Sequence, residues 1–439
     1  MTTLIVIPDN GSRHHWPPMG AGYLASSLQH CGERTCVWHQ DISHEEPSAM
    51  SHYVRFFNVD TVAVGWIAGK ETHRQAMTLC EVAKTTGKRL VVGGHGPSSD
   101  PVWHLTNTGA DVVLVGESEK AAEDWNGLDG IVVGDEPEEY QRCSGWDSVP
   151  LKFDKYLPMP AARSRSTDLV APVLTGRGCP YRCSFCYRQT DGRWDRPIES
   201  IIGEVEHFKD CYGVTFVQFQ DELLMTSPKR VEALCDALQP LGIRWSCQGR
   251  VNVAARDLGM LQRMHDAGCR FINYGVESTS QRVLDLMKKK QTPAQAELAV
   301  SATKQAGISP GLNMLWGAPG DNLDSLNSNV EFLLRHDDGA QLRTIRPVTP
   351  YPGSPLYQGL VADGVIEDTG DFYEQLVNSD LVCWDMMKCG DLAWANTRLM
   401  EANLRLLDNW RKRLGREHRR QATALYLDGD ETFRGWRQT

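Results

Sequence analysis

The stretch GRGCPYRCSFCYRQ at residues 176–189 places three cysteines, Cys179, Cys183 and Cys186, within eight positions. A structural zinc site uses four ligands, commonly in two CxxC or CxxH pairs, and no fourth Cys or His stands close to this motif. Three thiolates at CxxxCxxC spacing suit an iron–sulfur cube in which one iron stays free to bind a small molecule. Glycines beside Cys179 would let the backbone approach the sulfides and donate hydrogen bonds.

The size and charge of the chain limit its class. A chain of 439 residues exceeds one ordinary core, so we expect at least two domains. A formal net charge of −10 argues against a protein that coats nucleic acid or anionic membrane, because both need a positive surface. No apolar run reaches the roughly 18 to 20 residues of a membrane span, and the start, MTTLIVIPDN, lacks signal-peptide features. We expect a cytoplasmic protein with a small-molecule substrate, without nucleic-acid or membrane partners.

The first 120 residues alternate short β-branched runs with helical stretches. Five such runs predict an α/β domain at residues 1–135 with a parallel, doubly wound, flavodoxin-like (Rossmann-type) sheet. Ligands bind beyond the carboxyl ends of the strands in such sheets, and those ends are glycine-rich and polar here. The expected strands are residues 4–8, 36–41, 61–66, 89–94 and 111–117.

Residues 136–170 are first acidic and then rich in Pro and Trp, a composition that predicts a linker. A second alternation of strands and helices follows them. Six strand-and-helix steps at residues 171–365 predict a partial (β/α)6 barrel with its chemistry at the strand ends. Residues 366–439 predict a short helical C-terminal extension. The expected strands are 171–178, 214–222, 244–250, 270–278, 310–317 and 341–348, and the expected helices lie near 198–211, 227–239, 257–267, 293–306 and 322–336.

The cysteine motif and its setting resemble the radical S-adenosylmethionine (SAM) superfamily, whose CxxxCxxC motif follows the first barrel strand. The resemblance implies that Cys179, Cys183 and Cys186 hold a [4Fe–4S] cluster whose free iron chelates SAM. An electron from an external donor such as flavodoxin or ferredoxin would cleave SAM to a 5′-deoxyadenosyl radical. The alternative, three cysteines packed by chance or a truncated zinc knuckle, is disfavoured by the strand before the motif and the barrel pattern after it.

Polar residues at the ends of the expected barrel strands match family motifs more loosely. SAM needs a hydroxyl or carboxylate partner for its ribose and a cation or donor for its carboxylate. Glu277 and Ser278 suit the ribose, and Arg250 suits the carboxylate. The alternative is that each caps a helix or pairs with a neighbour, such as Arg250 with Glu277. The expected SAM contacts are Phe185, Gln248, Arg250, Glu277, Ser278, Asn313 and Arg346.

The resemblance extends upstream, because PPMGAGYLASSLQ, VVGGHGPSS and GADVVLVGESE look like the cobalamin-binding domain that precedes many radical SAM barrels. A corrin is a wide, nearly flat ring, so the sheet must present small residues at its strand ends. The expected cobalamin contacts are Asn10, Pro18, Met19, Gly20, Trp66, Gly93, Gly94, His95, Gly96, Ser98, Gly116 and Glu117.

The cobalt ligand is a separate question. The DxHxxG motif, which supplies a histidine to cobalt in mutases and methionine synthase, is absent. His14, His15 and His95 lie on the relevant loops, although an exposed loop histidine is commoner than a ligand. Trp66 is an alternative cover for one face of the ring. A cofactor-free domain that only supports the barrel is the remaining alternative.

Within this family, cobalamin beside a SAM radical centre most often means methylation of an unactivated carbon. The resemblance implies that one SAM methylates cob(I)alamin, and that a substrate radical made by a second SAM takes the methyl group. QGR, GVES and RPVTPYPGSPLY also resemble the branch with the anaerobic magnesium-protoporphyrin ester cyclase, so oxidative cyclisation, ring contraction or rearrangement is the alternative. A non-catalytic cobalamin or redox sensor is the alternative of another class. A tRNA methylthiotransferase is disfavoured, because it needs further cluster cysteines and a basic RNA-binding module.

Overall fold

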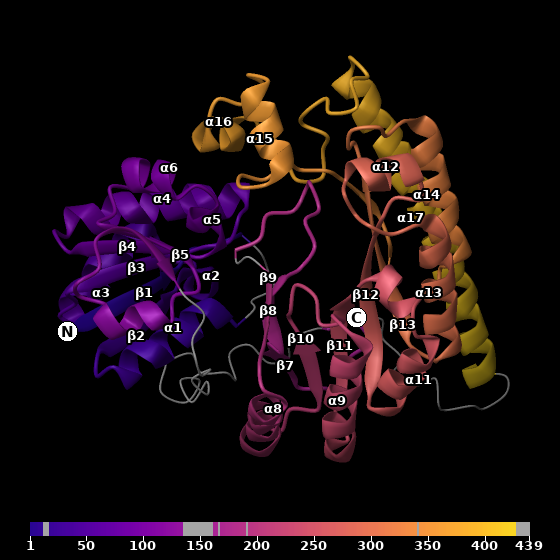
Figure 1. Cartoon of the computed structure of the whole chain (residues 1–439), viewed down its shortest axis with the longest axis horizontal. Helices are drawn as coiled ribbons and strands as arrows, with labels where there is room; N and C mark the ends of the chain where they lie inside the picture. The colour runs from indigo at the N-terminus through magenta and orange to yellow at the C-terminus, as the bar shows by residue number, and fades with distance from the viewer. Residues whose placement is uncertain (12–16, 135–160, 166, 190–191, 340–341, 427–439) are drawn as a thin grey trace. The chain divides into compact units, whose positions relative to one another are not determined.

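The computed structural model describes residues 1–11, 17–134, 161–165, 167–189, 192–339 and 342–426. The chain divides into two compact units, each with its own six-stranded parallel sheet (Figure 1). This confirms the α/β class with parallel-sheet domains. The first unit contains Met1–Met159, Leu174–Tyr212 and Pro350–Val377, and the second contains Pro160–Val173, Gly213–Thr349 and Asn378–Thr439.

The sheet of the first unit has the strand order β2-β1-β3-β4-β5-β6. Every neighbouring pair is parallel. The central strands are β-branched runs buried on both faces, as parallel sheets covered by helices require. The strands are β1 (Thr2–Ile7), β2 (Arg34–His39), β3 (Thr61–Gly65), β4 (Arg89–Gly93), β5 (Val112–Gly116) and β6 (Gly130–Gly134).

The sixth strand, β6, was not expected from the sequence. It is only five residues long, and Ile131 and Val133 are 40% and 71% exposed, so it carries no buried apolar run. Its backbone pairs with β5 along the full length, from Val112 opposite Gly130 to Gly116 opposite Gly134. Main-chain hydrogen bonds to a neighbour define this edge strand, and residue patterning does not reveal them.

The helices of the first unit come from three separate parts of the chain. Trp103 Nε1 in α6 donates a hydrogen bond to Asp368 Oδ2 (3.1 Å), and Thr369 Oγ1 donates to Asp100 Oδ2 (2.6 Å), so the late helices α15 and α16 belong to this unit. The helices are α1 (Met19–His30), α2 (Gln40–Ser43), η1 (Pro47–Ala49), α3 (Met50–Phe56), α4 (Lys70–Thr85), α5 (His95–Ser99), α6 (Pro101–Thr108), η2 (Lys120–Asp124), α8 (Ile198–Tyr212), α15 (Pro355–Ala362) and α16 (Thr369–Gln375).

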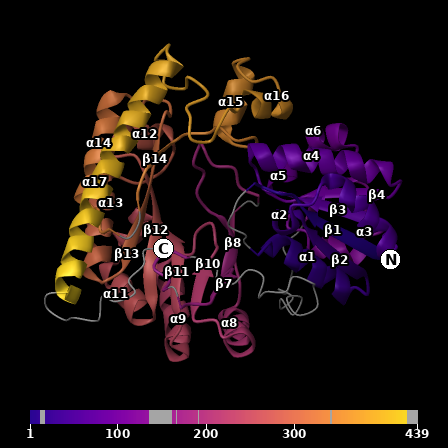
Figure 2. The same ribbon diagram turned by 180° about the vertical axis from the view of Figure 1, so that it is seen from behind.

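The sheet of the second unit runs β14-β13-β12-β11-β10-β7, so its strands follow one another in chain order, and all pairs are parallel. Its long last helix, α17, lies along α14 (Figures 1 and 2). The strands are β7 (Val170–Val173), β10 (Phe216–Phe219), β11 (Arg244–Gly249), β12 (Cys269–Glu277), β13 (Ser309–Trp316) and β14 (Ile345–Pro347). The helices are α9 (Pro228–Leu238), η4 (Gln239–Leu241), α10 (Val251–Ala254), α11 (Leu258–Asp266), α12 (Gln281–Leu286), α13 (Pro293–Gln305), α14 (Leu323–Arg335) and α17 (Leu392–Tyr426).

The single strand expected at residues 171–178 is two strands. β7 ends at Val173 in the sheet of the second unit, whereas β8 (Gly176–Cys179) pairs antiparallel with β9 (Gly192–Asp195) in the first unit. A Cβ on Gly176 would collide with the carbonyl oxygen of Trp194, so only glycine permits this close approach of the two strands. The apolar run ends at Leu174, and Thr175 and Gly176 mark the break in the sequence.

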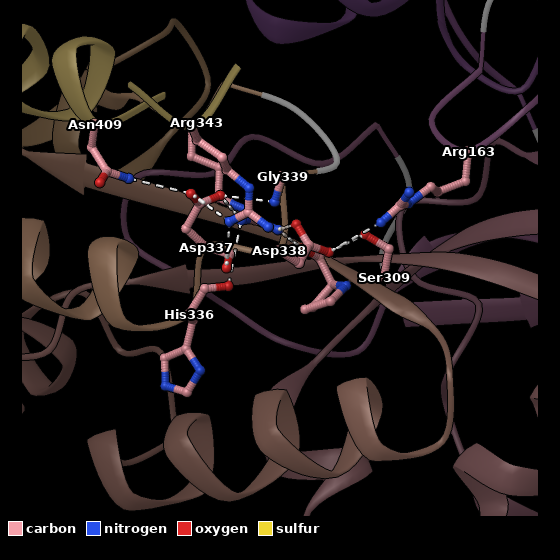
Figure 3. A network of polar contacts seen from close by, with 10 residues as sticks. Arg163, Ser309, His336, Asp337, Asp338, Gly339, Arg343 and Asn409 are labelled. Carbon is pink, nitrogen blue, oxygen red and sulfur yellow. Dashed lines mark hydrogen bonds and ion pairs between the residues drawn. The ribbon is translucent and has the colours of Figure 1, made fainter. Parts of the chain in front are cut away.

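A buried charge network fastens the end of α14 to the start of β13 and to α17 (Figure 3). The Arg343 side chain is 4% exposed, pairs with Asp338 (2.7 Å) and Asp337 (3.6 Å), and donates to the carbonyl oxygen of Pro310 (2.5 Å). Arg413 on α17 pairs with Asp337 (2.9 Å). The network lies where β13 begins, at the edge of the sheet opposite the strand ends that carry chemistry in parallel folds.

We expect Arg343→Leu to lower the free energy of unfolding by about 3–5 kcal/mol, because two largely buried carboxylates lose a shared cation. Urea unfolding followed by tryptophan fluorescence measures the change. Arg398→Leu is the matched control, because Arg398 and Glu401 form an exposed pair that contributes at most about 1 kcal/mol. Equal effects of the two substitutions would show that the buried network adds no stability.

A group of buried aromatic and imidazole rings joins α4 to α6 and α16 in the first unit. The His73 ring stacks on Tyr373 with a centroid distance of 3.8 Å, and His104 meets His73 edge-on at 5.8 Å. Burial lowers the pKa of His73 to about 3 and also lowers the pKa of His104. Between about pH 3 and pH 6.5, His73 is therefore neutral in the folded state and protonated in the unfolded state.

This difference predicts a loss of stability in acid. Below pH 6.5 the unfolded state binds a proton that folded His73 takes up only near pH 3, so stability is complete above pH 6.5 and falls by about 1.4 kcal/mol per pH unit between these values. His73→Phe keeps a stacking ring and should remove that part of the slope in urea unfolding between pH 6 and pH 4. The exposed His30→Phe variant should keep the wild-type slope. An unchanged slope in His73→Phe would contradict the prediction.

Candidate functional site

The three cysteines of the CxxxCxxC motif lie on the β8–β9 hairpin. Cys179 ends β8 opposite Gly192, and Cys183 and Cys186 follow in the connecting loop. Gly178 and Gly192 have φ of +73° and +83°, values that favour glycine, on either side of Cys179 in the hairpin. The amide of Cys186 donates to the carbonyl oxygen of Cys183 (3.2 Å), which makes a tight turn between the last two thiols. The hairpin geometry thus brings all three cysteines onto one short loop.

The thiols suit a cluster better than a single ion. Cys183 is buried, Cys179 is half-buried and Cys186 is exposed. Among the described residues, no three His, Cys, Asp or Glu side chains converge as ligands of one metal ion. In a [4Fe–4S] cube each thiolate binds a different iron, so the thiols need not converge on a single point. The donor set of three thiols on one loop therefore fits a cube with one open iron.

An arginine before the motif attaches β8 to the N-terminal sheet. The Arg177 guanidinium forms ion pairs with Glu117 and Glu119, which follow β5, and the three side chains are 10%, 13% and 7% exposed. Its Cζ also lies 4.9 Å from the ring centroid of Tyr23 on α1. Burial lowers the pKa of Arg177 to about 10, still well above neutral pH, so the guanidinium keeps its charge. Sequence analysis assigned Glu117 to cobalamin and missed Arg177 as its partner.

Residues after the motif make further contacts within the first unit. Gln189 Nε2 donates to the carbonyl oxygen of Gly116 at the end of β5 (2.6 Å). The Tyr187 ring meets the ring of His95, the first residue of α5, edge-on at 4.6 Å. The amide of Leu356 on α15 donates to the carbonyl oxygen of Ser184 (2.9 Å). The cysteine loop is thus held on both flanks by the strand ends of the N-terminal sheet.

The residues expected to contact cobalamin gather at one edge of that sheet. They lie at or just beyond the carboxyl ends of β1, β3, β4 and β5, which are adjacent strands, or at the start of α1. A Cβ on Gly20 would meet no atom within 4 Å, so α1 begins beside open space. These small residues fit a broad, flat ligand, whereas His14 and His15 lie outside the described residues. After β1 comes Asn10, and at the start of α1 stand Pro18, Met19 and Gly20. After β3 comes Trp66. At or after the end of β4 are Gly93, Gly94, His95, Gly96 and Ser98, and at or after the end of β5 are Gly116 and Glu117.

Several of these residues already have protein partners. Trp66 is 4% exposed and lies under the glycine loop after β4, where a Cβ on Gly96 would come within 2.5 Å of Trp66 Nε1. Gly94 turns that loop with a φ of +89°. Ser98 Oγ accepts a hydrogen bond from the amide of Gly116 (3.1 Å) and so joins the loops after β4 and β5. The structure thus gives Trp66 and Ser98 roles in shaping the edge.

The expected SAM contacts divide between the units. Phe185 lies on the cysteine loop of the first unit, and the other six lie in the second unit. Gln248 and Glu277 are at the carboxyl ends of the adjacent strands β11 and β12, and Arg250 and Ser278 come directly after them. Asn313 is exposed within β13, and Arg346, 58% exposed in β14, pairs with Asp380. Gln248, Arg250, Glu277 and Ser278 form one cluster at the ends of β11 and β12. Asn313 and Arg346 lie on the next two strands of the sheet, β13 and β14.

Glu277 has the most unusual setting in that cluster. Its φ is +65°, an uncommon value for a residue other than glycine, and the β12–β13 register shifts between Gly275 and Glu277. Its Oε1 lies 2.7 Å from Lys289 Nζ, and the two side chains are 8% and 7% exposed. A Cβ on Gly275 would collide with Glu277 Oε1 and come within 2.8 Å of Lys289 Nζ. Backbone strain of this kind is typical of functional sites.

Lys289 is the site residue that sequence analysis missed. It is the buried middle member of three consecutive lysines, and Lys288 and Lys290 on either side are exposed. Arg250, which was considered as a partner of Glu277, donates to the carbonyl oxygen of Lys289 and to Asn252 Oδ1 (3.2 Å). Gln248 Oε1 accepts from Asn273 Nδ2 (2.9 Å), and Ser278 Oγ accepts from the amide of Ser280 (3.1 Å). Lys289 is therefore a common partner of Glu277 and Arg250.

Comparison with models of protein families finds a match over the central part of the chain. The model of the Radical SAM superfamily matches residues 173–333, from the end of β7 through most of α14. The chain contains a radical SAM domain. The resemblance predicted from the three cysteines is therefore confirmed.

Two curated relatives and one solved structure extend the similarity over most of the chain. An uncharacterized methyltransferase of Pyrococcus horikoshii is 26% identical over 377 residues, which is 80% of each protein. The anaerobic magnesium-protoporphyrin IX monomethyl ester cyclase of Rubrivivax gelatinosus is 26% identical over 383 residues, 79% of this chain and 66% of the cyclase. The radical SAM methyltransferase TsrM of Kitasatospora setae, solved with tryptophan and a SAM analogue bound, matches with a TM-score of 0.67 and 19% identity over 83% of this chain and 77% of TsrM.

A further structure of TsrM contains cobalamin and a [4Fe–4S] cluster. At 19% and 18% identity, the likeness to the two TsrM structures shows the fold alone. Among the described residues, no helix combines the length and the apolar character needed to cross a bilayer.

Lys289→Met leaves the buried Glu277 carboxylate without its cation, so we expect a loss of roughly 3 kcal/mol in the free energy of unfolding. Lys288→Met is the matched control, because it removes the same charge from an exposed neighbour and should change stability by less than about 0.5 kcal/mol. Urea unfolding of both variants measures the difference. If Lys289→Met were as stable as Lys288→Met, Lys289 would not be the counter-ion of Glu277.

Proposed function

We propose that this protein is a cobalamin-dependent radical SAM enzyme that methylates an unactivated carbon of a small molecule. The observation that carries the proposal is the three-cysteine hairpin, packed in one compact unit with the glycine-rich strand ends of a parallel sheet. The strand order of that sheet supports a flavodoxin-like arrangement, and the sequential parallel strands of the second unit support a partial barrel. The similarity to a methyltransferase over 80% of the chain supports methyl transfer.

The chain's own residues hold and orient the cofactors in this proposal. Cys179, Cys183 and Cys186 bind three irons of a [4Fe–4S] cluster and leave the fourth open to the amino and carboxylate groups of SAM. When bound, the cluster supplies an electron for SAM cleavage, and cobalamin carries the methyl group. Glu277, oriented by Lys289, would accept hydrogen bonds from the SAM ribose at the end of β12.

The cobalamin ring belongs at the edge formed by the ends of β1, β3, β4 and β5. Glycines after β4 and β5 give the flat approach that a corrin requires, and the imidazole of His95 lies on that edge. Burial lowers the pKa of His95, so its ring is neutral at physiological pH. A neutral ring next to Tyr187 leaves no added positive charge beside the corrin.

A second candidate function is oxidative cyclisation, ring contraction or rearrangement without methyl transfer. It is favoured by the similarity to the magnesium-protoporphyrin ester cyclase over 79% of the chain. Both candidates use the same cluster, SAM and cobalamin. They differ in whether a SAM methyl group is consumed, so the products of SAM distinguish them.

The expected partners follow from this chemistry. An external one-electron donor such as flavodoxin or ferredoxin reduces the cluster in the cytoplasm. The net charge of −10 suits an enzyme of a small substrate. A tRNA or membrane substrate would need a basic surface to bind its phosphates.

Anaerobic reconstitution with iron, sulfide and hydroxocobalamin, followed by SAM and a reductant, tests the proposal. We expect close to four irons per chain and the formation of 5′-deoxyadenosine together with S-adenosylhomocysteine. Deoxyadenosine alone would favour the second candidate. A chain that holds no cluster and forms neither product would overturn both.

Cys→Ala substitutions at positions 179, 183 and 186 should each abolish deoxyadenosine formation, because a cube that loses one of three ligands is not held. Cys211→Ala is the matched control, since Cys211 is an exposed thiol on α8 in the same unit. It should keep wild-type iron content and product yield. Deoxyadenosine formed at the wild-type rate by any of the three triad variants would contradict the cluster assignment.

A further inference from the structure

The two flanks of the cysteine motif are attached to the two loops proposed for cobalamin. Before the motif, Arg177 pairs with Glu117 and Glu119 in the loop after β5. After the motif, Gln189 donates to the carbonyl oxygen of Gly116 (2.6 Å), and Tyr187 packs against His95 in the loop after β4. All of these residues belong to the first unit. The loop for the cluster and the loops for the corrin therefore share a set of contacts.

Arg177 is central to that set because its contacts are buried and charged. Its guanidinium meets two carboxylates and the face of Tyr23, so detaching it would expose two carboxylates that the fold has largely withdrawn from water. Removing one partner of a buried pair is far more costly than the pair's net contribution. We therefore expect β8 and the loop after β5 to move as one piece.

We propose that Arg177 is a positioning residue that couples the two cofactors, so that holding the cluster on the cysteine loop strengthens cobalamin binding at the β4 and β5 loops, and the reverse. This inference rests on the proposed function and extends it. A cluster that fixes Cys179 also fixes Arg177, two residues earlier, and with it Glu117 and Gly116. Cobalamin then meets loops that are already ordered and loses less conformational entropy on binding.

Linkage requires the coupling to be equal in both directions. The full-length protein should bind hydroxocobalamin roughly tenfold more tightly with the cluster reconstituted than after iron chelation, within the range usual for coupled sites. Anaerobic titration followed by the cobalamin absorbance measures both dissociation constants. The ratio of these constants is the readout, and a role in stability alone would not change it.

Arg177→Met should bring this ratio close to one while the iron content and the electron paramagnetic resonance signal of the cluster persist. Arg177→Lys keeps the charge and loses the two-pronged donor, so it should restore part of the ratio. Arg193→Met is the matched control, because Arg193 lies in the same hairpin, is 7% exposed and pairs with Asp195 within that hairpin. It should keep the tenfold ratio.

Gln189→Ala serves as a milder second variant if Arg177→Met does not fold, and it should reduce the ratio severalfold. Equal cobalamin affinities of the wild-type protein with and without its cluster would overturn the coupling and leave the proposed function standing. A ratio that stays tenfold in Arg177→Met, or in Gln189→Ala where that variant is used, would overturn the role of these contacts. A wild-type protein that binds neither cofactor would overturn the proposed function and the coupling with it.

Discussion

The buried pairing of Arg177 with two glutamates determines where the three cysteines of the motif lie. β8 is a four-residue strand with one short antiparallel neighbour, too little structure to hold a position alone. The guanidinium fixes it to the loop after β5, and Gln189 fixes the far side of the loop to the same strand end. The cysteine loop of the radical SAM domain is thus supported by a sheet outside the matched range.

A different constraint operates at the end of β12 in the second unit. Glu277 adopts a positive φ and lies buried against Lys289, and Gly275 provides the space for both side chains. A carboxylate held in this way keeps one orientation. The surrounding strands hold Glu277 in this strained backbone conformation.

Sequence patterning predicted the parts of this protein that repeat a simple physical rule. Buried β-branched runs predicted the central strands of the first sheet, because a parallel strand covered by helices on both faces must be apolar throughout. β6 was missed, because backbone hydrogen bonds define it and its side chains are largely exposed. The single strand expected at residues 171–178 is two strands, because the apolar run ends at Leu174 and the glycine-rich residues after it belong to a hairpin.

Site residues divide in the same way. Spacing alone was enough to propose the three cysteines as cluster ligands, because they lie on one short loop. Lys289 was not identified, because three adjacent lysines look alike in sequence and only the fold buries the middle one. Arg177 was overlooked for a related reason, since its partners lie about 60 residues earlier in the chain. Long-range pairs of this kind have no local pattern.

The return of residues 350–377 to the first unit has a consequence for how the protein is made. Lys70, Asp100 and Trp103 find partners 306, 269 and 265 residues later in the chain. A ribosome must synthesise these later residues before the faces are covered, so the N-terminal sheet emerges early and completes its packing late. Any chaperone that protects this nascent chain has to guard the α4 and α6 surfaces until Asp368, Thr369 and Leu376 have been made.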